Sequence, residues 1–259
     1  MSYFIATLPT PLFNRHDLAD LFDPLRRGLP LDQKKLFRPL EMIAFAQTAF
    51  KIVDQTYFPV CLVETTEYPS SVPLYLDVRF GKVGKEPFPT RIQKRPSKDT
   101  IIEQLLSYLG SCYIWGGNQV EGVAKMAYFY PPPLSLSPSA LTYWMFRGFD
   151  CSGLLYRATE GTVPRNTCDL LSFGRGIPIE GLNMKDIIEQ LLPLDYIVWP
   201  GHVVIVLDQS SVIESHHGRG GVVRLPLKER LAEIMRNRYP ANHFSISSSF
   251  FLVRRFLGC

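Results

Sequence analysis

The segment Gly148–Tyr156 places a cysteine at the expected first turn of a helix, and this feature constrains the fold around it. An acid precedes Cys151, two small residues follow it, and an apolar run begins at Leu154. A helix N-terminus carries about half a positive charge and several unpaired N–H groups, which favour a thiolate. Because the thiolate is the attacking form of sulfur, the segment predicts a nucleophile at Cys151. The alternative is a small buried core cysteine.

Three of the five histidines lie together downstream of this cysteine. Gly201–Asp208 is rich in β-branched residues, which predicts a buried strand with His202 at its entry. Val212–His217 predicts the next strand. Antiparallel pairing would bring His202 close to His216 or His217, but only one of these neighbours can face it. A nucleophile, a base and an orienting third group form the arrangement of nucleophilic catalysis.

These segments resemble the NlpC family of bacterial cell-wall cysteine peptidases. The matching segments, in order, are Tyr113–Asn118, Asp150–Leu154, Val163–Thr167, Leu194–Trp199 and Gly201–Val203. The resemblance covers residues 97 to 258 approximately and depends on the order and spacing of all five parts.

The resemblance implies Cys151 as nucleophile, His202 as general base and His216 as the orienting residue, with His217 as the competing choice. It places five further residues on the substrate or oxyanion side: Tyr113, Asp150, Ser152, Arg165 and Asn166. For Tyr113 the alternative is a core position beneath the helix. For Arg165 the alternative is a structural role, through a salt bridge or helix capping.

The family branch that the chain resembles has a bacterial SH3-like N-terminal domain and usually an aspartate after the proline-arginine pair. That aspartate recognises the free amine of an N-terminal L-alanine. Asn166 occupies the position in this chain and carries no charge, so a strict requirement for the free amine is not expected.

A second departure is an insertion at residues 119–147, between two motifs that are nearly adjacent in relatives. It contains Tyr128–Pro133, whose three prolines favour an extended conformation, and the aromatic run Leu141–Phe146. Long loops beside active sites are often lids, so the insertion is expected to overhang the cleft. The alternative is a surface excursion whose aromatic side chains cover a hydrophobic patch.

Composition excludes several other classes. A net charge of +4, without a basic run interleaved with aromatics, does not indicate nucleic-acid binding. Five widely spaced cysteines without a CxxC pair indicate free thiols in a reducing compartment. No cofactor or metal is expected, although Cys151, His202 and His216 could chemically form a metal site. No apolar run is long enough to span a membrane.

The segment Met1–Pro9 lacks the basic and apolar regions of a secretory signal. The expectation is therefore a cytoplasmic protein acting on recycled wall peptides. The alternative is a periplasmic location reached by a route that the sequence does not display. The sequence makes no prediction of oligomeric state.

Residues 1–90 contain short segments typical of strands, among them Phe50–Val53, Tyr57–Val63 and Tyr75–Phe80, and match the SH3-like β-barrel implied by the resemblance. Residues 91–259 form the expected peptidase domain, with helices first and strands after. The predicted class is α+β: a papain-like domain of helices on an antiparallel sheet, preceded by a small barrel that caps the substrate.

The resulting functional prediction is a cysteine endopeptidase that cuts peptidoglycan stem peptides between γ-D-glutamate and diaminopimelate through a thioester. Two alternatives stay open. One is an amidase or acyltransferase using the same cysteine–histidine chemistry, and the other is a non-catalytic muropeptide-binding protein.

Overall fold

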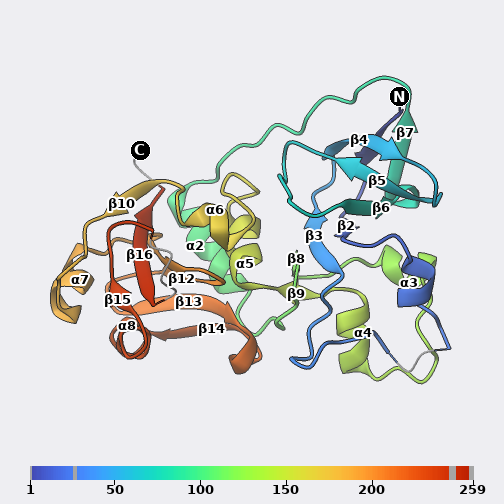
Figure 1. Ribbon diagram of the computed structural model, residues 1–259. Helices are drawn as coiled ribbons and strands as arrows, with labels where there is room; N and C mark the ends of the chain where they lie inside the picture. Colours follow the sequence, from blue (N-terminus) through green and yellow to red (C-terminus); the bar gives the residue numbers. More distant parts are fainter. Residues whose placement is uncertain (1, 26–27, 245–248, 257–259) are drawn as a thin grey trace. The chain divides into compact units, whose positions relative to one another are not determined.

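The computed structural model describes residues 2–25, 28–244 and 249–256, which form two compact units (Figure 1). Unit 1 contains Met1–Ile92 and Ile114–Phe149, and unit 2 contains Gln93–Tyr113 and Asp150–Cys259. The first boundary lies close to the expected position at residue 90. Unit 1 also contains residues 114–149. The sequence predicts these residues as part of the peptidase domain. Cys259 lies outside the described residues.

Unit 1 is built on a seven-stranded antiparallel sheet with the order β3-β2-β6-β5-β4-β1-β7. The strands are β1 (Ser2–Ala6), β2 (Thr10–Phe13), β3 (Leu40–Ala44), β4 (Ala49–Asp54), β5 (Val60–Glu64), β6 (Leu74–Asp77) and β7 (Gly81–Gly84), with the short helix α1 (Leu18–Leu21) after β2 and a 3-10 turn (Val78–Phe80) after β6. Buried Phe50 and Ile52 alternate with exposed Lys51 and Val53 in β4, as in a half-buried strand. The predicted strand Phe50–Val53 is confirmed by β4. Tyr57–Val63 is strand only from Val60, and Tyr75–Phe80 only to Asp77, after which the 3-10 turn begins. The SH3-like barrel stays a prediction.

The insertion is part of unit 1. It contributes α3 (Lys125–Phe129) and α4 (Pro138–Trp144), between the paired short strands β8 (Asn118–Gln119) and β9 (Gly148–Phe149). Trp144 is fully buried, its indole N–H donates to the Tyr130 carbonyl at 2.8 Å, and its ring lies 5.5 Å from that of Phe22. The burial of Trp144 agrees with the alternative of aromatics that cover a hydrophobic patch, and the expected position over the cleft stays a prediction.

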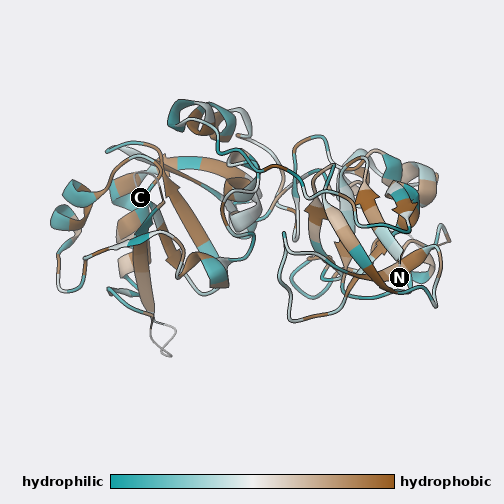
Figure 2. Cartoon of the chain, turned by 90° about the horizontal axis from the view of Figure 1, so that it is seen from above, coloured by the Kyte–Doolittle hydropathy of each residue, from teal (hydrophilic) through white to brown (hydrophobic). Residues whose placement is uncertain are grey.

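Unit 2 contains a six-stranded sheet with the order β10-β16-β11-β12-β13-β14, in which all neighbours are antiparallel. The strands are β10 (Arg175–Ile177), β11 (Tyr196–Trp199), β12 (His202–Val206), β13 (Ser211–His216), β14 (Gly221–Pro226) and β16 (Phe250–Arg255), and β15 (Tyr239–Pro240) pairs with β16 in parallel. Figure 2 colours most of these strands as hydrophobic, which fits strands buried beneath helices.

The helices of unit 2 are α2 (Lys98–Ser107), α5 (Cys151–Ala158), α6 (Thr167–Leu170), α7 (Met184–Gln190) and α8 (Leu227–Met235), with a 3-10 turn at His217–Arg219. Helix α5 packs against α2, β12 and β13. A hydrophobic core lies between the sheet and helices α7 and α8. Its members include Ile187, Leu227 and Leu231 on the helices and Val204 and Val212 on the strands. Helices on an antiparallel sheet form the α+β arrangement that the sequence predicts.

Candidate active site

Cys151 is the first residue of α5, as the sequence predicts. Asp150 precedes it in an extended conformation, and the Asp150 carboxylate accepts a hydrogen bond from the Gly153 N–H at 2.6 Å. This N-cap fixes the start of the helix, so the sulfur lies at its positive end. Cys151 is 6% exposed, and its Sγ lies 3.9 Å from the Gly201 carbonyl oxygen.

A buried ion pair anchors the same helix start. Arg165 donates to both oxygens of Asp150, at 2.9 and 2.7 Å, and to the Ser152 hydroxyl at 3.0 Å. All three residues are less than 10% exposed. Their side chains therefore bind one another beneath the cysteine. This pairing favours the structural alternative for Arg165, and the substrate or oxyanion role of these side chains stays a prediction.

A tight turn positions His202. Strands β11 and β12 are joined by Pro200-Gly201, and Trp199 pairs directly with His202 across the turn. Proline at the first central position and glycine at φ +91° in the second are typical of a type II turn. The His202 ring lies 5.1 Å from the Trp199 ring. The same hairpin therefore carries both the histidine and the Gly201 carbonyl.

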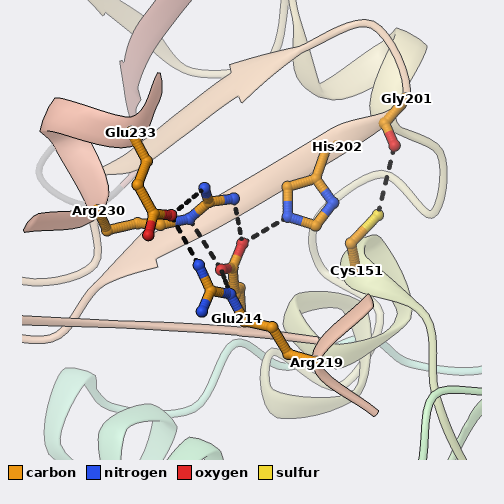
Figure 3. Close-up of polar contacts among 7 residues, drawn as sticks. All are labelled: Cys151, Gly201, His202, Glu214, Arg219, Arg230 and Glu233. Carbon is orange, nitrogen blue, oxygen red and sulfur yellow. Dashed lines mark hydrogen bonds and ion pairs between the residues drawn. The ribbon is translucent and has the colours of Figure 1, made fainter. Parts of the chain in front are cut away.

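The partner of the histidine ring is Glu214, which the sequence analysis did not select. Glu214 lies in β13 and is fully buried, and its Oε2 is 2.6 Å from His202 Nε2 (Figure 3). The ring lies between this carboxylate and Cys151. A thiol, an imidazole and a carboxylate are thus brought together from α5, β12 and β13.

The strand register explains why the glutamate, and not a histidine, reaches the ring nitrogen. Strand β12 pairs with β13 through Ile205 and Ile213. Counting back along this register sets His202 directly across from His216, with Glu214 two residues away on the same face. The two histidine rings lie 5.2 Å apart in a T-shaped arrangement, whereas the longer glutamate side chain extends to the Nε2 atom.

His216 and His217 therefore do not occupy the expected position. His216 is half-buried, its Nδ1 has no hydrogen-bond partner, and burial lowers its pKa. His217 is exposed, begins the 3-10 turn and packs against the Tyr113 ring at 5.4 Å. The sequence did contain the relevant signal, because an acid two residues before His216 must share its strand face.

The electrostatics of the site favour a charged imidazole. Burial lowers the pKa of His202, but hydrogen bonds and charges from Cys151 and Glu214 outweigh burial and raise the pKa from 6.5 to about 9. Burial raises the pKa of Glu214, but His202 and Arg230 outweigh it and hold that pKa below its ordinary value. At neutral pH the geometry therefore supports an imidazolium next to a carboxylate.

Two arginines and a second glutamate extend this site, as Figure 3 shows. Arg230 in α8 places its Nε 2.8 Å from Glu214 Oε1 and its Nη2 2.9 Å from Oε2. Arg230 Nη1 and Arg219 Nη2 both contact Glu233 Oε2, at 3.0 and 2.6 Å. Arg219 Nε lies 3.7 Å from Glu214 Oε1. Neither arginine was selected from the sequence, which offered no motif to mark them.

Tyr113 and Asn166 are the remaining predicted site residues. Tyr113 is half-buried, and its backbone N–H donates to the Gly220 carbonyl at 3.0 Å. Asn166 is half-buried and caps the start of α6, where its carbonyl accepts from the Asp169 and Leu170 amides. Substrate roles for both residues stay predictions.

Within residues 2–25, 28–244 and 249–256, no group of three or more His, Cys, Asp or Glu side chains is arranged to hold a metal ion. No helix in the same ranges is long and apolar enough to cross a membrane.

Unit 2 thus belongs to the class of α+β proteins in which a cysteine at a helix start meets a histidine on an adjoining antiparallel sheet. The peptidoglycan endopeptidase RipB of Mycobacterium tuberculosis is 27% identical to the chain over 145 residues, which are 54% of this chain and 52% of RipB. The chain therefore spans about half the length of this curated relative. No protein-family model matches it. The similarity to RipB agrees with the sequence motifs that resemble the NlpC family.

Solved structures show similarity at lower identity. The structure of RipB from M. tuberculosis is 22% identical, with a TM-score of 0.38 over 61% of this chain and 64% of that one. An NlpC/P60 family protein from Bacillus cereus ATCC 10987 is 17% identical, with a TM-score of 0.39 over 99% of this chain and 63% of that one.

Proposed function

We propose that the protein is a cysteine peptidase that hydrolyses the stem peptides of peptidoglycan. The observation that carries this proposal is the position of the His202 ring, between Cys151 at the start of α5 and the buried carboxylate of Glu214. The substrate class is supported by RipB, which is named a peptidoglycan endopeptidase.

Each step of the reaction has a residue in place. His202 accepts the Cys151 proton, and the thiolate attacks the amide carbonyl. Helix-start N–H groups, that of Cys151 among them, hold the oxyanion because the first amides of a helix have no intrahelical partner. The imidazolium then protonates the leaving amine and a thioester remains. Water activated by His202 hydrolyses the thioester and restores the thiol.

Glu214 takes the orienting role that the sequence analysis gave to His216. A carboxylate at 2.6 Å from Nε2 fixes the ring so that Nδ1 is left for the sulfur, and it stabilises the imidazolium formed in each half-reaction. The proposed set is therefore Cys151, His202 and Glu214.

The bond that we propose is the amide between γ-D-glutamate and diaminopimelate, which the family resemblance implies. Asn166 is neutral where the relevant branch usually has an aspartate. It can accept a hydrogen bond from an ammonium group but adds no charge, so substrates with a blocked amine are expected to be cleaved at a comparable rate.

The proposal is tested by mass spectrometry of L-Ala-γ-D-Glu-meso-diaminopimelate incubated with the protein. Release of L-Ala-D-Glu by the wild type, and not by Cys151→Ala, is the expected result. Cys168→Ala is the matched control, because Cys168 is an exposed free cysteine in α6 and plays no part in the proposed reaction. The N-acetylated peptide, run in parallel, tests the expectation for Asn166.

Other outcomes are informative. No cleavage of this peptide or of longer and cross-linked stem peptides would overturn the endopeptidase proposal. Products formed only when an amine acceptor is added would identify a transferase that uses the same cysteine. Tight muropeptide binding without turnover, and without alkylation of Cys151, would identify a binding protein.

A further inference from the structure

Helix α8 carries an arginine where its sequence pattern calls for an apolar residue. Leu227, Leu231 and Ile234 are buried and define the face of the helix that packs on the sheet. Arg230 lies on the same face, at the i+3 position from Leu227, and is only 8% exposed. Burying a guanidinium is costly unless it is paired, so this position requires an explanation.

The partner of this arginine is the carboxylate that holds the histidine. Arg230 Nη2 donates a hydrogen bond to Glu214 Oε2 at 2.9 Å, and Oε2 is also the oxygen 2.6 Å from His202 Nε2. Arg230 Nε lies 2.8 Å from Oε1 as an ion pair without hydrogen-bond geometry. A two-point contact with a planar guanidinium fixes the rotation of a carboxylate, which a single contact does not. Figure 3 shows the guanidinium and the imidazole on the same carboxylate.

The charges of the cluster balance without the histidine. Arg230 and Arg219 bring two positive charges, and Glu214 and Glu233 bring two negative charges. His216 also faces this cluster, and burial lowers its pKa, which favours its neutral form. A protonated His202 therefore adds one positive charge to a cluster that is otherwise balanced.

We propose that Arg230 is a positioning residue that acts through Glu214 to hold the His202 ring against Cys151. This inference rests on the proposed function, because it assigns Arg230 to the same site. Its two consequences are a fixed ring orientation and a carboxylate that stays charged when the imidazole loses its proton. Replacement of Arg230 is therefore expected to reduce the reactivity of Cys151 without touching the sulfur or the substrate.

The experiment measures alkylation of Cys151 by iodoacetamide between pH 5 and 9, with each cysteine followed by peptide mass spectrometry. Exposed Cys168 is the internal reference for an accessible thiol. The variant is Arg230→Lys, which keeps the charge but loses the two-point geometry. Its matched control is Arg224→Lys, since Arg224 is an exposed arginine of β14 paired with Asp208 at 3.2 Å. Circular dichroism melts of each variant report folding.

The expected result is a loss of about tenfold or more in the alkylation rate of Cys151 near pH 6 for Arg230→Lys, because small misplacements of an active-site group have effects of this size. Arg224→Lys leaves the rate unchanged. In a Glu214→Gln background, Arg230→Lys causes no further loss, since the arginine acts through that glutamate. Cys168 reacts equally in all variants.

Two results would overturn the proposal. One is an unchanged Cys151 rate in a folded Arg230→Lys variant, and the other is a full additional loss in the Glu214→Gln background. The assay needs no peptide substrate, so it separates this inference from the proposed function. A protein that cleaves no stem peptide but shows the expected alkylation pattern would contradict only the proposed function.

Discussion

Glu214 Oε2 and His202 Nε2 lie 2.6 Å apart, with the carboxylate fully buried and the imidazole nearly so. Glu214 in β13 reaches His202 in β12 diagonally, whereas His216 is the residue directly across from the histidine. This contact makes the third member of the site a carboxylate and leaves the expected member, His216, as a ring packed edge-on against the imidazole.

Substitution of the third residue separates the two assignments. Glu214→Gln keeps the shape of the side chain but removes its charge, and is expected to reduce kcat by roughly 10²–10⁴-fold, as loss of the carboxylate does in comparable triads. His216→Ala is expected to reduce kcat by less than about tenfold, because its ring makes contact but no hydrogen bond to His202. Steady-state hydrolysis of the stem peptide measures both. A larger effect at His216 would restore the original assignment.

The pH dependence of the reaction follows from His202. Its pKa is raised from 6.5 to about 9, so the imidazolium persists through neutral pH and the leaving amine can be protonated. The profile of kcat/KM is expected to fall on the alkaline side with a midpoint near pH 9. In Glu214→Gln the midpoint moves to lower pH, because the carboxylate that stabilises the charged ring is lost. An unchanged midpoint in that variant would contradict the contact.

The same proton contributes to folding stability. Since the pKa of His202 is higher in the folded state, the contribution is complete below about pH 6.5 and is lost as the pH rises through about 9. Urea unfolding between pH 6 and 10 is expected to show this decline in the wild type and a smaller one in His202→Gln. Equal declines in the two proteins would assign the pH dependence to other groups.

Arg165 is expected to contribute mainly to folding stability and less to substrate binding. Its guanidinium is paired with Asp150 in a buried site, and removing one partner of such a pair costs about 3–5 kcal/mol. Arg165→Met should lower the free energy of unfolding by this amount in urea titrations. Lys185→Met is the control, because Lys185 pairs with Glu189 on the exposed surface of α7 and contributes less than about 1 kcal/mol. A stable Arg165→Met protein with an increased KM would instead support substrate recognition.

Two aromatic residues of the insertion differ in burial and therefore in their expected effect on stability. Trp144→Ala is expected to reduce stability by about 3–5 kcal/mol, because it empties a fully buried site and breaks the 2.8 Å bond to the Tyr130 carbonyl. Tyr128→Ala, at a residue 72% exposed in the same insertion, should change stability by less than about 0.5 kcal/mol. Thermal unfolding measures both. If Trp144→Ala left stability intact and altered only KM, the lid interpretation would regain support.

The sequence predicted those features that depend on local patterns. The helix start at Cys151, the strand with His202 at its entry and the antiparallel order that follows are all written in short segments with clear periodicity. Cys151 and His202 could be selected for this reason, and the structure brings them together. The role of Glu214 was within reach, because its position on the same strand face as His216 follows from the period of two.

Contacts between residues far apart in the sequence could not be predicted from the sequence alone. Arg230 looks like an ordinary surface residue of a charged helix until α8 is placed on β13, and only then does its burial become visible. The aromatic residues of the insertion look equally suited to a lid and to a core, since composition alone does not say which surface they cover. Arg165 and Asp150 are 15 residues apart, and their pairing depends on how the chain returns after α5.

Unit 1 is discontinuous, and this affects the order in which the protein can fold during synthesis. Its sheet is encoded before residue 92, but Trp144 and Phe146 of its core emerge only after α2 and Tyr113, which belong to unit 2. The nascent sheet must therefore wait, with apolar surface uncovered, for about 50 further residues. The last strand of that unit, β9, ends at Phe149, two residues before Cys151. Completion of the first unit and emergence of Cys151 thus fall at nearly the same moment of translation.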